Sequence, residues 1–151
     1  MQQAIPQRTD NRPGQNRERT GAAAVEFALI APLFLLFLAG IVEFGNAFRI
    51  EHSLSNACRR GARVAVTRGT TSAQVEQKVQ SHCAKLLGVA ETDVTVVTSL
   101  NGLDNTEIGP AVQGDEIMVS VSLPYSKASV GFFSSWFSEA TLSSACIMER
   151  E

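Results

Sequence analysis

The chain has 151 residues, of which 44% are apolar, which is enough for one modest core. Its formal net charge of −2 provides no basic field for nucleic acid, so we expect no nucleic-acid partner. His52 and His82 offer little for a metal, and the three cysteines lack the CxxC spacing of a zinc or redox motif. Since no phosphate-binding glycine loop and no activated nucleophile stands out, the sequence predicts neither an enzyme nor a cofactor.

A polar N-terminal run is followed by a long apolar one. Residues 1–20 hold four arginines and no aromatic residue, so they predict a disordered leader. Residues 22–42 carry one charge, that of Glu26, and at helical rise they span roughly 31 Å, the thickness of a bilayer core. We therefore expect a transmembrane helix, in preference to a buried core helix. Because arginines outnumber acids in the leader, the positive-inside rule places the N-terminus in the cytoplasm.

Helical periodicity continues beyond the apolar run. Over residues 43–68, apolar side chains recur mostly every three or four positions, which predicts an amphipathic extension that ends at Gly69. Its apolar positions are Phe44, Phe48, Ile50, Leu54, Cys58, Ala62 and Ala65. Hydroxyl side chains at residues 70–72 then predict the cap of a second helix, which runs to about Leu87 and stops at Gly88. The apolar stripe of this second helix is Val75, Val79, Cys83 and Leu86.

Strand patterns occupy the rest of the chain. Residues 93–99, 116–123 and 141–148 are rich in β-branched or alternating apolar residues, so they predict three strands. Residues 100–114 predict a flexible connection. The expected fold is α+β: a long N-terminal transmembrane and amphipathic helix, followed by a small head over residues 70–151 with one helix and a three-stranded antiparallel sheet. Four aromatic residues before the last strand are expected to cover the sheet or to rest at the headgroup level, namely Phe132, Phe133, Trp136 and Phe137.

A short motif marks the boundary between the leader and the apolar run. Gly21–Phe27 places a glycine, four small or apolar residues, Glu26 and Phe27 in succession, and it resembles the processing site of type IV prepilins. The resemblance implies that a prepilin peptidase cuts between Gly21 and Ala22 and removes residues 1–21. It also implies that Glu26 pairs with the new ammonium of Ala22, in its own chain or in a neighbour, and so sets the register of the subunit. The alternative is a Glu26 side chain that snorkels to the headgroups.

Further residues are similar to the TadE-like family. They are residues 41–45, the Gly-Ala-Arg turn Gly61–Arg63 in residues 56–66, the pair Gly114-Asp115, Pro124-Tyr125-Ser126 and the C-terminal residues 148–151. This resemblance implies a minor pseudopilin of the tight-adherence secretion system, accessory to the assembly of Flp pili that serve adhesion. Ala22 departs from the aromatic residue or methionine of many type IV pilins, which bears on N-methylation and not on cleavage.

The same resemblance implies a location and partners. The protein would be a single-pass protein of the inner membrane, with its N-terminus cytoplasmic and its head periplasmic, and it could enter a pilus. Its partners would be the prepilin peptidase, other pilin-like subunits and the inner-membrane assembly platform. The alternative function is that of an uncleaved, membrane-anchored periplasmic binding or adhesin module.

Two small groups of residues complete the candidate sites. Arg59 and Arg63 lie one helical turn apart; they either bind an acidic partner, form a solvated helix face, or make salt bridges to the acidic head. Gly61, next to Ala62, costs roughly 1 kcal/mol relative to alanine inside a helix, which predicts close packing against another element or a partner helix.

The cysteines offer more than one arrangement. Cys58 and Cys83 fall on the apolar stripes of adjacent helices, and an oxidising periplasm would permit a disulfide between them. Cys146, on the last strand, is an alternative partner for Cys83. Three unpaired buried thiols are the third possibility.

Overall fold

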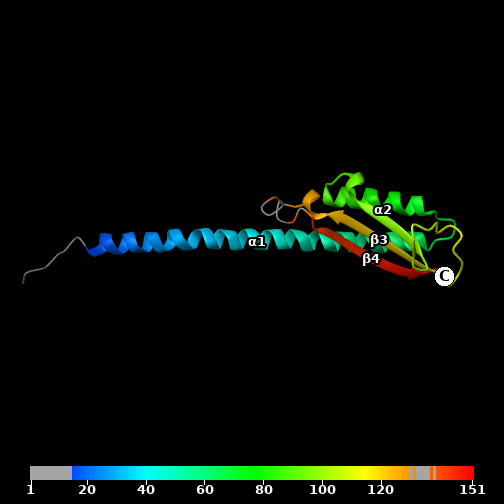
Figure 1. The fold of residues 1–151 in the computed structure, drawn as a ribbon, viewed down its shortest axis with the longest axis horizontal. Helices are drawn as coiled ribbons and strands as arrows, with labels where there is room; N and C mark the ends of the chain where they lie inside the picture. Colours follow the sequence, from blue (N-terminus) through cyan, green and yellow to red (C-terminus); the bar gives the residue numbers. More distant parts are fainter. Residues whose placement is uncertain (1–14, 130, 132–136, 138) are drawn as a thin grey trace, which may run out of the picture. The chain divides into compact units, whose positions relative to one another are not determined.

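The computed structural model describes residues 15–129, 131, 137 and 139–151 (Figure 1). Within these residues, two α-helices and four strands follow one another, with two short 3-10 helices between them. The chain forms two compact units, Met1–Gly40 and Ile41–Glu151. The elements are α1 (Gln15–Ala65), α2 (Ser72–Leu87), η1 (Glu91–Asp93), β1 (Thr95–Leu100), β2 (Leu103–Asp104), β3 (Glu116–Pro124), η2 (Tyr125–Lys127) and β4 (Thr141–Glu149).

Helix α1 is longer at its start than the sequence predicted. Residues 15–20 are helical, although residues 1–20 were expected to be a disordered leader; residues 1–14 lie outside the described part of the chain. Glutamine, arginine and glutamate are good helix formers, and extending a helix that already exists avoids the cost of nucleation. At the other end α1 stops at Ala65, and Gly69 follows with a left-handed φ of 81°.

The boundaries of helix α2 follow the predicted capping residues. The Thr71 side chain accepts a hydrogen bond from the Gln74 backbone N–H, and the Gln74 side chain accepts one from the Thr71 N–H, which makes a capping box. Gly88 adopts the left-handed conformation with φ 70° and donates its N–H to Ala84 O at 2.8 Å. The predicted hydroxyl cap and glycine stop of this helix are confirmed.

The sheet is antiparallel and has four strands in the order β2-β1-β3-β4. The prediction of three strands was wrong because it missed the hairpin between β1 and β2. In this hairpin Leu100 pairs with Leu103 across Asn101 and Gly102, whose φ values are 51° and 80°. Positive φ at both central residues is the geometry of a tight two-residue hairpin, for which Asn-Gly is the preferred sequence. Part of the expected flexible connection is therefore a strand.

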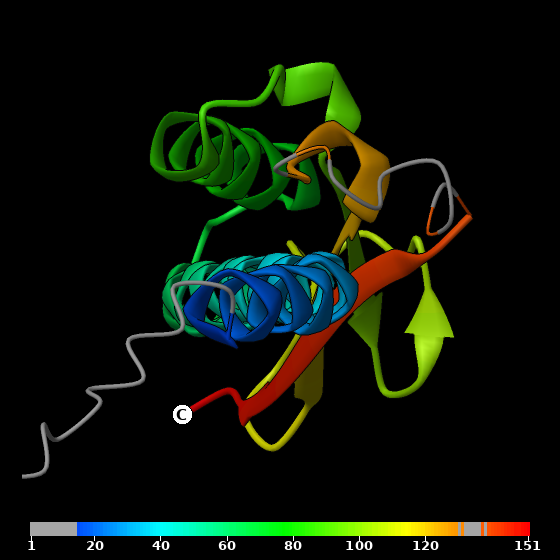
Figure 2. The ribbon, with the colours of Figure 1, turned by 90° about the vertical axis from the view of Figure 1, so that its left-hand side faces the viewer.

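One face of the sheet packs against helices, as the end-on view shows (Figure 2). Along β3, Ile117, Val119, Val121 and Leu123 are buried, whereas the residues between them are half-buried. The alternation places the apolar side chains of β3 toward the core that they form with α2 and the part of α1 within Ile41–Glu151. The opposite face mixes hydroxyl, apolar and charged side chains.

The apolar stripes of the helices differ in part from those expected. On α1, the buried stripe begins at Ile50 and includes Leu54 and Cys58, but Phe44 and Phe48 are 65% and 67% exposed. On α2, Leu86 is exposed. Helical spacing places a side chain on a face, whereas the extent of the sheet decides how much of that face is covered.

Candidate processing and assembly segment

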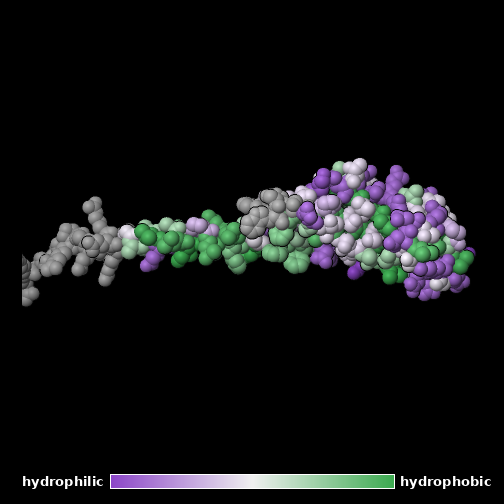
Figure 3. All heavy atoms as spheres, in the orientation of Figure 1, coloured by the Kyte–Doolittle hydropathy of each residue, from purple (hydrophilic) through white to green (hydrophobic). Residues whose placement is uncertain are grey.

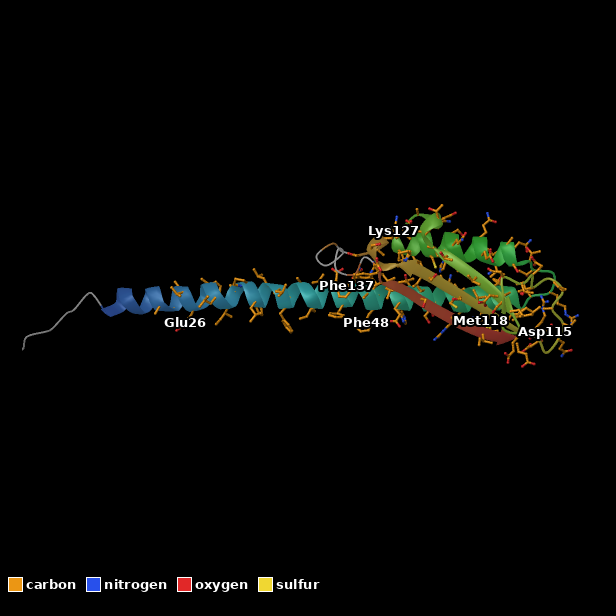
Figure 4. The ribbon with its side chains drawn as sticks, in the orientation of Figure 1. Glu26, Phe48, Asp115, Met118, Lys127 and Phe137 are labelled. Atoms are coloured by element: carbon orange, nitrogen blue, oxygen red, sulfur yellow. The ribbon has the colours of Figure 1, made fainter. Side chains whose placement is uncertain are left out.

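The predicted processing site lies on an open stretch of α1. Gly21, Ala22, Glu26 and Phe27 are all exposed, and a Cβ added at Gly21 would meet no atom within 4 Å. Glu26 forms no hydrogen bond or ion pair with any residue that the structure describes, and its side chain projects away from the helix (Figure 4). The backbone at Gly21 is thus free of steric cover within Met1–Gly40.

The residues after Glu26 form an apolar surface on all sides of the helix. Space-filling atoms of this stretch are predominantly hydrophobic (Figure 3). An 18-residue window has a mean hydropathy of 2.5, with none of it buried, and the helix is long and apolar enough to cross a membrane. Large side chains such as Phe27 and Leu29 are more than 70% exposed. Monomeric soluble proteins rarely expose a continuous apolar surface of this kind, so this helix suggests single-pass membrane anchoring.

The Gly-Ala-Arg turn lies where α1 approaches α2 and β3. A Cβ added at Gly61 would lie 2.6 Å from Val79 Cγ2 and 3.2 Å from Val119 Cγ1, so only a hydrogen fits there. Ala62 is fully buried, whereas Arg59 and Arg63 are exposed and form no ion pair with any described residue. The close approach of Gly61 is thus to elements of the same chain, and a role of the arginines in binding a partner stays a prediction.

A comparison with known proteins identifies part of this helix. The family model described as TadE-like protein matches residues 21–63. We call residues 21–63 the TadE-like segment. The match begins at the glycine of the predicted processing site and ends at the arginine of the Gly-Ala-Arg turn. No curated protein and no solved structure matches the chain. Residues 64–151, which include Gly114-Asp115 and the C-terminal residues, lie outside the match.

A buried carboxylate lies where the TadE-like segment enters the head. Glu43 is only 4% exposed, and its Oε1 accepts a hydrogen bond of 2.6 Å from the Tyr125 hydroxyl. The same hydroxyl lies 3.3 Å from the Glu43 carbonyl oxygen. Burial, followed by this hydrogen bond to Glu43, raises the pKa of Tyr125 to about 12. Oε2 of Glu43 is buried and has no hydrogen-bond partner among the described residues, so the bond from Tyr125 to Oε1 compensates part of the cost of burying this carboxylate.

Other contacts also attach this part of α1 to the residues around Tyr125. Asn46, one turn after Glu43, donates its side-chain N–H to Ala128 O at 2.8 Å. The Phe137 ring meets the Tyr125 ring edge to face, with 6.3 Å between the ring centres. Phe132, Phe133 and Trp136, which were expected to cover the sheet or to rest at the headgroups, lie outside the described residues.

A buried arginine closes the opposite end of the head. Arg150 is 2% exposed, and its guanidinium donates hydrogen bonds to four backbone carbonyl oxygens. They belong to Val66 and Thr67, just beyond α1, and to Ile108 and Ala111, in the connection before β3. The shortest bond, to Ala111 O, is 2.6 Å. Arg150 thereby joins the chain after the TadE-like segment to the 100–114 connection, where Ile108 is fully buried.

The three cysteines are free thiols. Cys58, in the TadE-like segment, and Cys83, on α2, are buried, whereas Cys146, on β4, is half-buried. Burial raises the pKa of Cys83 to about 11. Burial first, and then the neighbouring Cys146, raises the pKa of Cys58 to about 12. The predicted Cys58–Cys83 disulfide is not formed in this structure and stays a prediction.

Sequence reasoning named Glu43, Tyr125 and Arg150 only within segments that resemble the family, and it did not predict their contacts in the head. Glu43 had a visible signal, since it is the first charge after the apolar run. Tyr125 is the only tyrosine and follows a proline at the end of a predicted strand. Arg150 carried no sign of burial, because an arginine is usually solvated.

Proposed function

We propose that this protein is a minor pseudopilin that assists assembly of a tight-adherence (Flp-type) pilus and does not catalyse a reaction. A prepilin peptidase would remove residues 1–21 by cutting after Gly21, on the cytoplasmic side of the inner membrane. The apolar helix would then remain as a single-pass anchor or enter a filament, with the head in the periplasm. The observation that carries the proposal is the TadE-like match, which starts at Gly21 on an uncovered apolar helix.

The openness of the helix at Gly21 supports the processing step. A peptidase needs an accessible backbone, and no side chain of the described structure covers Gly21. With a polar leader before it and an apolar run after it, this peptide bond would lie at a membrane surface.

Glu26 would serve in assembly after cleavage. A carboxylate within the hydrocarbon edge is costly unless it is paired, and Glu26 has no partner among the described residues. The ammonium created at Ala22 would supply an opposite charge one helical turn away, in the same subunit or in a neighbour. This pairing would set the register of the helix among other pilin-like subunits.

The head would act as the part that contacts other subunits and the assembly platform. Glu43, Tyr125 and Asn46 hold the C-terminal half of the TadE-like segment against it. A force on the anchor would therefore reach the sheet through buried contacts.

The test is the N-terminal residue of the mature protein, determined by mass spectrometry after extraction from membranes of cells with an active prepilin peptidase. We expect a chain that begins at Ala22. The Gly21→Arg variant should keep its leader because the long charged side chain blocks the cut, whereas the matched Gly21→Ala variant should lose less processing. An intact leader in the wild-type protein, or a different cut site, would contradict the proposal and favour an uncleaved, membrane-anchored periplasmic binding module.

A further inference from the structure

The thiol of Cys58 points toward the sheet. Its Sγ donates a hydrogen bond of 2.8 Å to Val119 O on β3. Cys58 is fully buried, so its thiol has no contact with solvent. A cysteine on α1 therefore lies directly over a central strand of the head.

The strand register brings a second cysteine to the same place. Val119 pairs directly with Cys146 on β4. Side chains of a directly opposite pair point to the same face of a sheet, with their Cβ atoms about 5 Å apart. Val119 is fully buried on the face that packs against the helices, so Cys146 also points to that face, beside the carbonyl that Cys58 touches.

The third cysteine is a near neighbour with a different relation to Cys58. Val79 of α2 approaches Gly61 of α1. Cys83 follows Val79 by one helical turn, and Cys58 precedes Gly61 by almost one turn. The Cys58 thiol, however, is directed to β3 and not to α2. Cys146 also raises the pKa of Cys58 more than the charge interaction with Cys83 does.

From the thiol direction and the strand register, we infer that Cys58 and Cys146 are a disulfide-forming pair that ties α1 to the edge strand β4. The two thiols would lose two protons and two electrons as the S–S bond forms. A disulfide of the glutathione or protein type accepts them and leaves as two thiols. The half-buried Cys146 is the sulfur that an oxidant can reach first, and Cys58 then displaces the oxidant.

The bond would close a loop of about 90 residues, which is long enough for a large entropic stabilisation of the head. It would also link the helix that carries the apolar anchor to the last strand of the chain. Occurrence of the bond in cells rests on the proposed periplasmic location, whereas its formation in a test tube does not.

Peptide mapping distinguishes the pairings, because trypsin places the cysteines in the separate peptides 50–59, 79–85 and 128–150. The full chain is purified in detergent, reduced, unfolded, and refolded with a mixture of reduced and oxidised glutathione; free thiols are then alkylated. We expect peptide 50–59 joined to 128–150 and Cys83 alkylated. The melting temperature should rise by on the order of 10 °C over that of the reduced protein.

Two variants and one parallel sample sharpen the result. Cys83→Ala should still form the bond, whereas Cys146→Ser should abolish it. A join between peptides 50–59 and 79–85, or three alkylated thiols under oxidising conditions, would overturn the inference. Protein trapped by acid and alkylated directly from cells is the parallel sample: if it is reduced although the bond forms with glutathione, the pairing stands and the periplasmic location fails.

Discussion

Helix α1 uses its leucines in two opposite ways. Leu33, in the apolar run, is 69% exposed, whereas Leu54, in the part that belongs to the head, is fully buried. Around Leu33 the helix is apolar on every side, and around Leu54 it is apolar on one stripe only. The difference teaches that the arrangement of apolar residues around a helix, and not their number, indicates what will pack against it. A helix that is apolar all round suits lipid or other helices, and a stripe suits one sheet.

The largest expected effect is a truncation at Leu54 compared with one at Leu33. Leu54→Ala removes a fully buried side chain and should lower the free energy of unfolding of the head by about 2–5 kcal/mol. Leu33→Ala should leave the unfolding of the head unchanged, because nothing in the described structure covers that side chain. Chemical denaturation of both proteins in detergent, followed by circular dichroism, measures the difference. Equal losses of unfolding free energy in the two variants would show that both halves of the helix contribute alike to the stability of the head.

A second comparison uses two glycines of the same helix. Gly61→Ala forces a methyl group to within 2.6 Å of Val79 Cγ2 and should cost about 1–3 kcal/mol. Gly40→Ala, where a Cβ meets no atom within 4 Å, should be neutral or stabilise the helix by up to about 1 kcal/mol. Thermal melting of both variants tests this. Gly61→Ala as stable as the parent would mean that the contact with α2 is loose.

The smallest expected effect concerns the point where exposed helix becomes buried helix. The pKa of Tyr125 is raised to about 12, above the ordinary value of 10.0, so this group stabilises the head fully below about pH 10 and the contribution is lost as the pH rises through 12. Because Tyr125 is the only tyrosine, its tyrosinate absorbance can be followed without interference. We expect a midpoint near 12 in the folded protein and near 10 in denaturant. A midpoint near 10 in the folded protein would contradict the buried pair with Glu43.

Much of the local structure was predictable from local signals. Thr71 and Gly88 cap α2 as expected, because capping depends on a few neighbouring residues. The alternation of Ile117, Val119 and Val121 predicted a strand with one buried face, which β3 is. The Asn101-Gly102 pair is a recognisable hairpin sequence, but strand β2 has only two residues, which is too short for an alternating apolar pattern.

Contacts between distant residues could not be predicted in the same way. The hydrogen bond of Tyr125 with Glu43 joins residues 82 positions apart, and the contact of Cys58 with Val119 joins residues 61 apart. No periodicity or spacing encodes which of several polar side chains will be buried together. The buried Arg150 is the extreme case, since its four carbonyl partners come from two separate segments.

The sequence by itself determined the anchor-like helix, the caps of α2, the strand pattern and the motif at Gly21, because helix formation, capping and apolar patterning act over a few residues. Only the tertiary structure decided that Phe44 and Phe48 stay exposed, that Gly61 faces Val79, and that Cys58 turns toward the strand beside Cys146. These outcomes depend on where the sheet ends and on which backbone atoms it presents to the helix. Both the end of the sheet and the backbone atoms that face the helix are set by the packing of the whole sheet against the two helices, and not by any single segment.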